Sequence, residues 1–106
     1  TNFTLIRGSL SETVGPSGSG KGHVIKRCPN CGDQIYSHFM GLNNLLVLKT
    51  TTLSNANELP PQAHVFLDSK LEWLKLSDNI PKFDKFYRRE EIYSNESLER
   101  MKIALQ

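Results

Sequence analysis

Apolar and polar positions alternate over several short stretches, a pattern that predicts β-strands rather than long helices. The two clearest strands are residues 23–27 and 34–39, and the Cys-Pro-Asn-Cys-Gly turn between them predicts a β-hairpin. Weaker strand patterns cover residues 3–7, 12–14, 44–52, 64–67 and 73–76. Loops are expected where Ser, Gly, Asn and Pro gather, in residues 8–22 and 53–62, and a loop or a single helical turn is expected in residues 77–86. The pattern therefore predicts a mainly β fold.

One helix is expected, at the C-terminal end of the chain. Leu98, Met101 and Leu105 recur at the spacing of one helical face, and charged residues occupy the other positions. Ser94 or Asn95 can cap this helix, because a short polar side chain accepts a hydrogen bond from a free amide of the first turn. We therefore expect a short C-terminal helix beside the strands.

A glycine-rich stretch, residues 15–22, resembles the phosphate-binding loop of nucleotide-binding proteins. Gly22 stands where that motif has the Ser or Thr that binds magnesium, and the next residues are typical of a strand. A phosphate loop must lead directly into a helix, whose first amides hold the phosphate. We interpret the stretch as a flexible hairpin loop.

Composition indicates one ordinary globular domain, residues 1–106. With 38% hydrophobic and 23% charged residues, the chain is not typical of disordered proteins. Its net charge of +2 gives no electrostatic reason for binding nucleic acid. The apolar run of residues 45–48 is too short to span a membrane, so no membrane partner is expected. Two cysteines cannot form a disulfide framework, which favours a reducing compartment, the cytoplasm or the nucleus.

The turn between the two clearest strands carries the strongest chemical signal. Cys28 and Cys31 are separated by two residues, the spacing at which two thiolates converge on one tetrahedral zinc ion. Pro29 favours a turn, and Gly32 tolerates the positive φ at which a chain reverses. A redox-active pair and two ordinary thiols remain alternatives. A thioredoxin-like pair would open a helix, whereas this pair lies between strands.

A structural zinc site needs four ligands, and the chain has two cysteines. His23, His38 and His64 are the remaining candidates, although side chains so far along a strand usually point elsewhere. One hypothesis is a complete site of two cysteines and two histidines. The favoured hypothesis is a half-site, Cys28 and Cys31, whose other ligands come from outside the chain.

Aromatic residues are frequent in the second half of the chain. Basic side chains that could hold nucleic acid lie between them, but acidic side chains are interleaved equally and cancel their charge. We interpret the aromatics as core residues beneath a mixed charged surface. They are Phe66, Trp73, Phe83, Phe86, Tyr87 and Tyr93.

Taken together, several motifs resemble the glutathione-dependent formaldehyde-activating enzyme family, whose domain is shared with centromere protein V. The resemblance covers about residues 3–87, and the order of its segments is more specific than any single one. It is carried by the opening residues 3–8, Ser17-Gly18-Ser19-Gly20-Lys21, Arg27-Cys28-Pro29-Asn30-Cys31-Gly32, Ile35-Tyr36-Ser37, His64-Val65-Phe66, Ser69-Lys70, Trp73 and Ile80-Pro81-Lys82-Phe83.

The resemblance implies a zinc-binding sandwich of the β-tent type and a carbon–sulfur lyase activity. Glutathione and formaldehyde would be the substrates, joined as S-hydroxymethylglutathione. By resemblance, Cys28 and Cys31 correspond to the last cysteine pair of the family, which completes a structural zinc site with a pair near the N-terminus. The catalytic zinc of the family lies in a separate cysteine cluster.

The chain departs from the family pattern because it contains neither of the other cysteine groups. The resemblance therefore places it as the C-terminal portion of such a domain, or as a relative without the metal sites. No residue is assigned a catalytic role, and we expect no catalysis by this chain alone. A non-catalytic zinc-knuckle scaffold and a chromatin- or nucleic-acid-binding module are the alternative functions. We also expect compensation for a small core through dimerisation at exposed strand edges, giving a homodimer.

Overall fold

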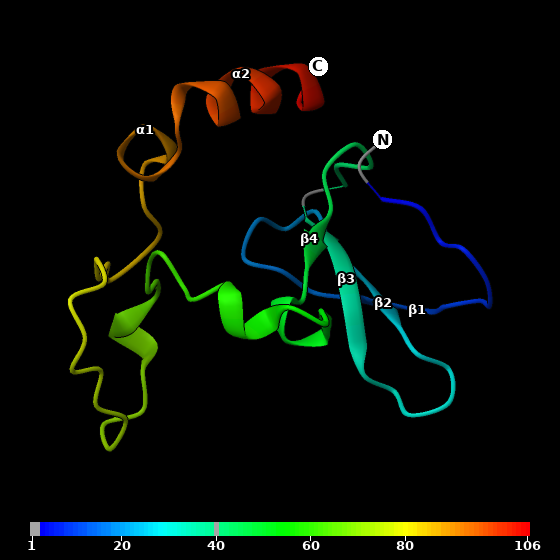
Figure 1. The fold of residues 1–106 in the computed structure, drawn as a ribbon, viewed down its shortest axis with the longest axis horizontal. Coiled ribbons are helices and arrows are strands. Elements are labelled where there is room, and N and C mark those ends of the chain that lie inside the picture. Colours follow the sequence, from blue (N-terminus) through cyan, green and yellow to red (C-terminus); the bar gives the residue numbers. More distant parts are fainter. Residues whose placement is uncertain (1–2, 40) are drawn as a thin grey trace. The chain divides into compact units, whose positions relative to one another are not determined.

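A computed structural model describes residues 3–39 and 41–106 of the chain. Its elements are β1 (Ser11–Gly15), β2 (His23–Arg27), β3 (Gln34–Phe39), β4 (Val47–Leu48), α1 (Arg89–Ile92) and α2 (Asn95–Ala104), shown in Figure 1. Three short 3-10 turns, Thr50–Thr52, Ala56–Glu58 and Leu67–Ser69, lie between β4 and α1. The chain divides into two compact units near Ala56, called here the N-terminal and C-terminal units.

The N-terminal unit is built on a four-stranded antiparallel sheet in the order β1-β2-β3-β4. The predicted hairpin is confirmed, since β2 and β3 cover residues 23–27 and 34–39 and pair across the cysteine turn. The weaker pattern at residues 12–14 is also confirmed, as part of β1. Each strand pairs with its neighbour in sequence, so short turns are sufficient to connect them.

A β-bulge interrupts the pairing of β2 with β3 just before the cysteine turn. Lys26 pairs with Tyr36, but the next residue, Arg27, pairs with Gln34. Ile35 is therefore one residue more than β2 can match, and its carbonyl accepts a hydrogen bond from the Lys49 amide at 2.9 Å. An extra residue of this kind bends the strand and increases its twist, here next to the candidate site.

Burial in the N-terminal unit is greatest at the centre of the sheet. Ser37 on β3 is 1% exposed, and no hydrophobic side chain among the described residues is as fully buried. Aromatic contacts cover both faces of the hairpin. Phe3 meets Tyr36 edge-on at a centroid distance of 4.9 Å, and His23 stacks on Phe39 at 4.1 Å.

Two strand predictions in this unit need correction. Residues 3–7 do not form a strand, and Leu5 and Ile6 are 49% and 92% exposed. No backbone hydrogen bond joins residues 3–7 to a neighbour within the described chain, and a strand without a partner is not stable. The pattern at residues 44–52 yields only Val47–Leu48, followed by a 3-10 turn at Thr50–Thr52.

The C-terminal unit lacks two strands that the sequence predicted. Residues 64–67 contribute only an isolated bridge between His64 and Lys82, because Phe66 takes a left-handed conformation (φ 56°) that ends the extended run. Residues 73–76 form no strand, and the Leu74 amide bonds the Leu71 carbonyl in a turn instead. Residues 73–76 had suitable side chains but no neighbouring strand, and β-propensity alone does not supply a pairing partner.

The predicted C-terminal helix is confirmed as α2. Ser94 is its cap, since its Oγ accepts a hydrogen bond from the Ser97 amide at 3.2 Å. A second helix, the single turn α1, was not predicted. Across residues 3–39 and 41–106, every helix is too short or too polar to cross a bilayer.

The interpretation of the aromatics as core residues is wrong for three of them. Phe66, Trp73 and Phe86 are 51%, 74% and 54% exposed. The others are half-buried around Tyr87, which stacks on Phe86 at 4.2 Å and packs against Tyr93 at 5.9 Å. Two short helices and a set of loops provide too little surface to enclose six large rings, so several of these aromatic side chains stay exposed to solvent.

Candidate metal site

Cys28 and Cys31 lie in the turn that joins β2 to β3 (Figure 1). The turn is closed by two backbone hydrogen bonds: Cys28 donates to the Asp33 carbonyl at 2.8 Å, and Gly32 donates to the Cys28 carbonyl at 2.9 Å. Gly32 has a φ of 78°, as its position in the reversal predicted. The structure therefore places both cysteines at a reversal between strands.

The two thiols lie within hydrogen-bonding reach of each other on this turn. Both are free; Cys28 is half-buried and Cys31 is exposed. Hydrogen bonds from the backbone amides of Cys31 and Asn30, and then from the Cys31 thiol, lower the pKa of Cys28. A thiolate is the form in which cysteine binds metal. The turn thus brings two thiols together, and backbone amides are directed at one of them.

Two ion pairs and one further cation lie next to the cysteine turn, which is the tip of the hairpin. Lys26 bonds Glu12 across β1 and β2 at 2.5 Å, which raises the pKa of Lys26. Lys49 bonds Asp33 at 2.6 Å, which lowers the pKa of Asp33. Arg27 donates to the Gly32 carbonyl at 3.2 Å. These three cations and two carboxylates leave the tip with one net positive charge.

None of the three histidines joins the cysteines. His23 pairs with Phe39 at the far end of the hairpin, and the His38 Nδ1 lies 2.8 Å from the Leu45 carbonyl, to which it donates. His64 belongs to the C-terminal unit. In the part of the chain that the structure describes, no three His, Cys, Asp or Glu side chains are grouped to hold a metal ion. The hypothesis of a complete two-cysteine, two-histidine site is therefore not supported within the described residues, and the half-site of Cys28 and Cys31 stays a prediction.

Two thiolates on a tight turn fit one half of a structural zinc site. The chain's own residues therefore support a structural role for the turn.

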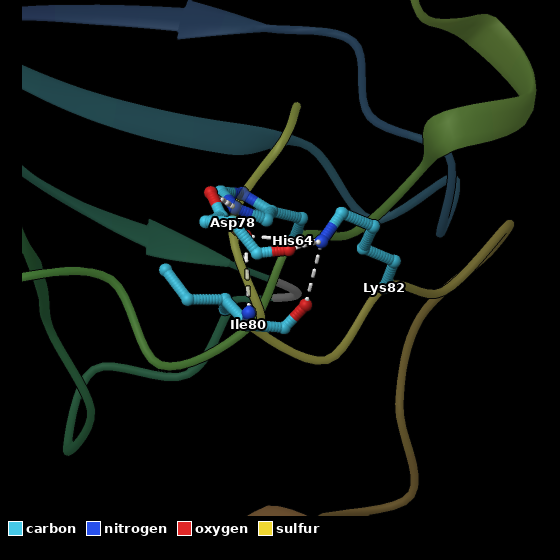
Figure 2. A network of polar contacts seen from close by, with 4 residues as sticks. All are labelled: His64, Asp78, Ile80 and Lys82. Atoms are coloured by element: carbon cyan, nitrogen blue, oxygen red, sulfur yellow. Dashed lines mark hydrogen bonds and ion pairs between the residues drawn. The ribbon is translucent and has the colours of Figure 1, made fainter. Parts of the chain in front are cut away.

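A second polar site, in the C-terminal unit, was missed at the sequence level. Figure 2 shows Asp78 between His64 and Lys82: its Oδ2 lies 3.0 Å from His64 Nε2, and its Oδ1 lies 3.0 Å from Lys82 Nζ. The Ile80 amide also donates to Oδ1 at 3.0 Å. The hydrogen bond from His64, followed by that from Lys82, lowers the pKa of Asp78 to about 2. An Asp that bonds the amide two residues on is a common turn signal, and it could have marked one end of this network.

The glycine-rich stretch is a hairpin loop, as interpreted. It joins β1 to β2, and the Gly20 amide closes it with a bond to the Ser17 carbonyl at 3.0 Å. A strand follows it where a phosphate loop would have a helix. The phosphate-binding alternative is excluded on this geometry.

The sheet and its turn define a small antiparallel β protein with a dithiol hairpin tip. A model of the glutathione-dependent formaldehyde-activating enzyme family matches residues 1–69, which include the whole sheet and both cysteines. The chain belongs to this family. Searches of curated proteins and of solved structures find no match.

Proposed function

We propose that the protein acts in the glutathione-dependent activation of formaldehyde, with Cys28 and Cys31 as structural zinc ligands. The observation that carries the proposal is the family match over residues 1–69, which includes the dithiol turn. The antiparallel arrangement of β1 to β4 is compatible with a zinc-binding sandwich of the β-tent type, which we propose as the complete fold. Zinc would tie the ends of β2 and β3 together at the turn.

The reaction that this family membership indicates is the addition of a thiol to a carbonyl. The glutathione sulfur forms a bond to the formaldehyde carbon, and the thiol proton ends on the former carbonyl oxygen, giving S-hydroxymethylglutathione. The reverse reaction breaks the carbon–sulfur bond, as in a carbon–sulfur lyase. We assign no catalytic residue, since no group of this chain corresponds to the catalytic cluster, and we propose that the chain alone does not accelerate this step.

A reducing compartment, the cytoplasm or the nucleus, suits this proposal, because zinc ligation requires both thiols in the reduced state. The near-neutral net charge of +2 supports small-molecule chemistry over a nucleic-acid platform. A salt-dependent affinity for DNA would favour the platform instead.

The test combines binding with turnover. The reduced, zinc-loaded chain is mixed with glutathione and 13C-formaldehyde, and NMR follows both glutathione binding and exchange into the adduct. We expect saturable glutathione binding and an exchange rate equal to that of the spontaneous reaction. Zinc binding without glutathione binding would indicate a non-catalytic scaffold. An exchange rate above the spontaneous one would overturn the proposal that this chain is inactive alone.

A further inference from the structure

Ser37 and His23 lie on the same face of the sheet, on the neighbouring strands β3 and β2. In the pairing of these strands, Ser37 is opposite Ile25, and Phe39 is opposite His23. Because side chains two residues apart on a strand share a face, Ser37 and His23 are diagonal neighbours. Diagonal positions are about 7–8 Å apart, a span that a long or aromatic side chain can reach across. One small molecule can therefore contact both side chains.

Both residues carry a buried polar atom without a hydrogen-bond partner. Among the described residues, the Ser37 hydroxyl and the His23 Nε2 atom are buried and make no hydrogen bond. Ser37 as a whole is 1% exposed, so bulk solvent does not reach its hydroxyl. An unpaired polar group in such a place costs free energy, and folded proteins commonly satisfy these groups with an ordered water molecule.

The side chains directly across from Ser37 and His23 offer no donor or acceptor. They are Ile25 and Val47, which flank Ser37, and Phe39 and Gly15, which flank His23. Phe39 stacks on the imidazole at a centroid distance of 4.1 Å, which covers one side of the ring. The two polar atoms therefore need a partner that the adjacent side chains of the sheet do not supply.

Gly15 leaves room beside the imidazole. It is opposite His23 on β1, and a Cβ built at Gly15 would meet no atom within 4 Å. Any larger residue at this position would direct its side chain to the face that carries His23. The glycine thus keeps space for a small molecule next to the ring.

We propose that one buried water molecule lies between Ser37 and His23 and bonds the hydroxyl of the first and Nε2 of the second. Water both donates and accepts, and so does a serine hydroxyl, so all three groups are satisfied for either position of the imidazole proton. A metal ion is a poorer fit, since one imidazole and one neutral hydroxyl are too few ligands. The water links β2 to β3 at the end of the hairpin away from the cysteine turn, and it is independent of zinc binding and of the proposed function.

A high-resolution crystal structure of the chain tests the position of this water. We expect a water oxygen within about 2.7–3.2 Å of both Ser37 Oγ and His23 Nε2. A direct hydrogen bond between the two side chains, or a bond from either atom to another protein group in place of water, would overturn the proposal.

A double-mutant cycle tests the same link in solution by chemical unfolding. Ser37→Ala and His23→Phe should each raise the unfolding equilibrium constant by about tenfold, because each leaves the other polar atom buried and unpaired. The double variant should cost no more than either single variant, since both polar groups are then gone. Additive losses would show that the two atoms have separate partners and would overturn the shared water.

Ser11→Ala provides the matched control. Ser11 is also a strand serine of this sheet, but it is exposed and its hydroxyl donates to the Arg27 carbonyl at 3.3 Å. Its loss should simply add to that of His23→Phe. If Ser37→Ala or His23→Phe does not fold, the crystal structure of the unmodified chain still decides whether the water is present.

Discussion

His64 and Asp78 are joined by a hydrogen bond of 3.0 Å across fourteen positions of sequence. Backbone hydrogen bonds also join residues 64–68 to residues 81–85. The His64 amide donates to the Pro81 carbonyl at 2.9 Å, and the Phe83 amide donates to the His64 carbonyl at 2.9 Å. The side-chain pair therefore reinforces a backbone ribbon that organises the C-terminal unit.

Acid should weaken this ribbon. The pKa of Asp78 is about 2 in the folded chain, below its ordinary value of 3.8. A carboxylate with a lowered pKa stabilises the fold fully above the unfolded value, and its contribution is lost as the pH falls through the folded value. We expect the protection of the Phe83 amide against hydrogen exchange to decline between about pH 4 and 2. Asp78→Asn should remove this decline, and Asp84→Asn should keep it.

Alkali should act through Tyr87. Burial, and then the hydrogen bond that Tyr87 donates to Tyr93 at 3.3 Å, raise the pKa of Tyr87 to about 12. The unfolded chain releases this proton first, so the stability that Tyr87 contributes is present below pH 10 and is lost as the pH rises through about 12. Ultraviolet titration should show one late-ionising tyrosine that disappears in Tyr87→Phe. Persistence of the late step in that variant would contradict the assignment.

Gly32→Ala should weaken the dithiol turn. Gly32 has a φ of 78°, and a Cβ there would meet no atom within 4 Å, so the cost is conformational rather than steric. A left-handed residue other than glycine costs about 1–2 kcal/mol. We expect a loss of that order in chemical unfolding of the N-terminal unit, together with weaker Co²⁺ binding. Gly18→Ala is the matched control: it also has open space, but no positive φ, and should leave both quantities nearly unchanged.

Ser94→Ala should destabilise α2. The serine hydroxyl accepts the Ser97 amide at 3.2 Å, and loss of such a cap costs about 0.5–2 kcal/mol. Circular dichroism should report less helix and an earlier unfolding midpoint. Ser94→Asp retains an acceptor at this position and should restore most of the signal. Equal helicity in the alanine and aspartate variants would argue against a capping role.

Local signals predicted the parts of the fold that depend on neighbours in sequence. The hairpin at residues 23–39 was predicted with the observed bounds, because alternation and turn chemistry are both contained in it. Residues 3–7 and 73–76 had comparable side chains but no strand beside them, and residues 64–67 form only the single bridge from His64 to Lys82. Pairing partners are not encoded in a short run. The four-residue α1 is too short to show a helical period.

The candidate sites divide in the same way. Cys28 and Cys31 were recognisable because their spacing and their turn residues are local. The bond between His64 and Asp78 depends on how two distant loops meet, and neither residue carries a signal for the other. The same limitation explains the exposed Trp73, since a large aromatic residue indicates burial only when another surface covers it.

Ile35, the extra residue of the β-bulge, limits where residues can be inserted into or deleted from this chain. Deleting Ile35 would make Lys26–Tyr36 and Arg27–Gln34 consecutive regular pairs, and it would remove the bend and extra twist that the bulge gives to the hairpin next to the cysteine turn. The loop between β1 and β2 lies outside the strand pairing and carries no such constraint. Relatives that keep the dithiol turn are therefore expected to gain or lose residues in the Ser/Gly loop and to keep a fixed count from Cys31 to Tyr36.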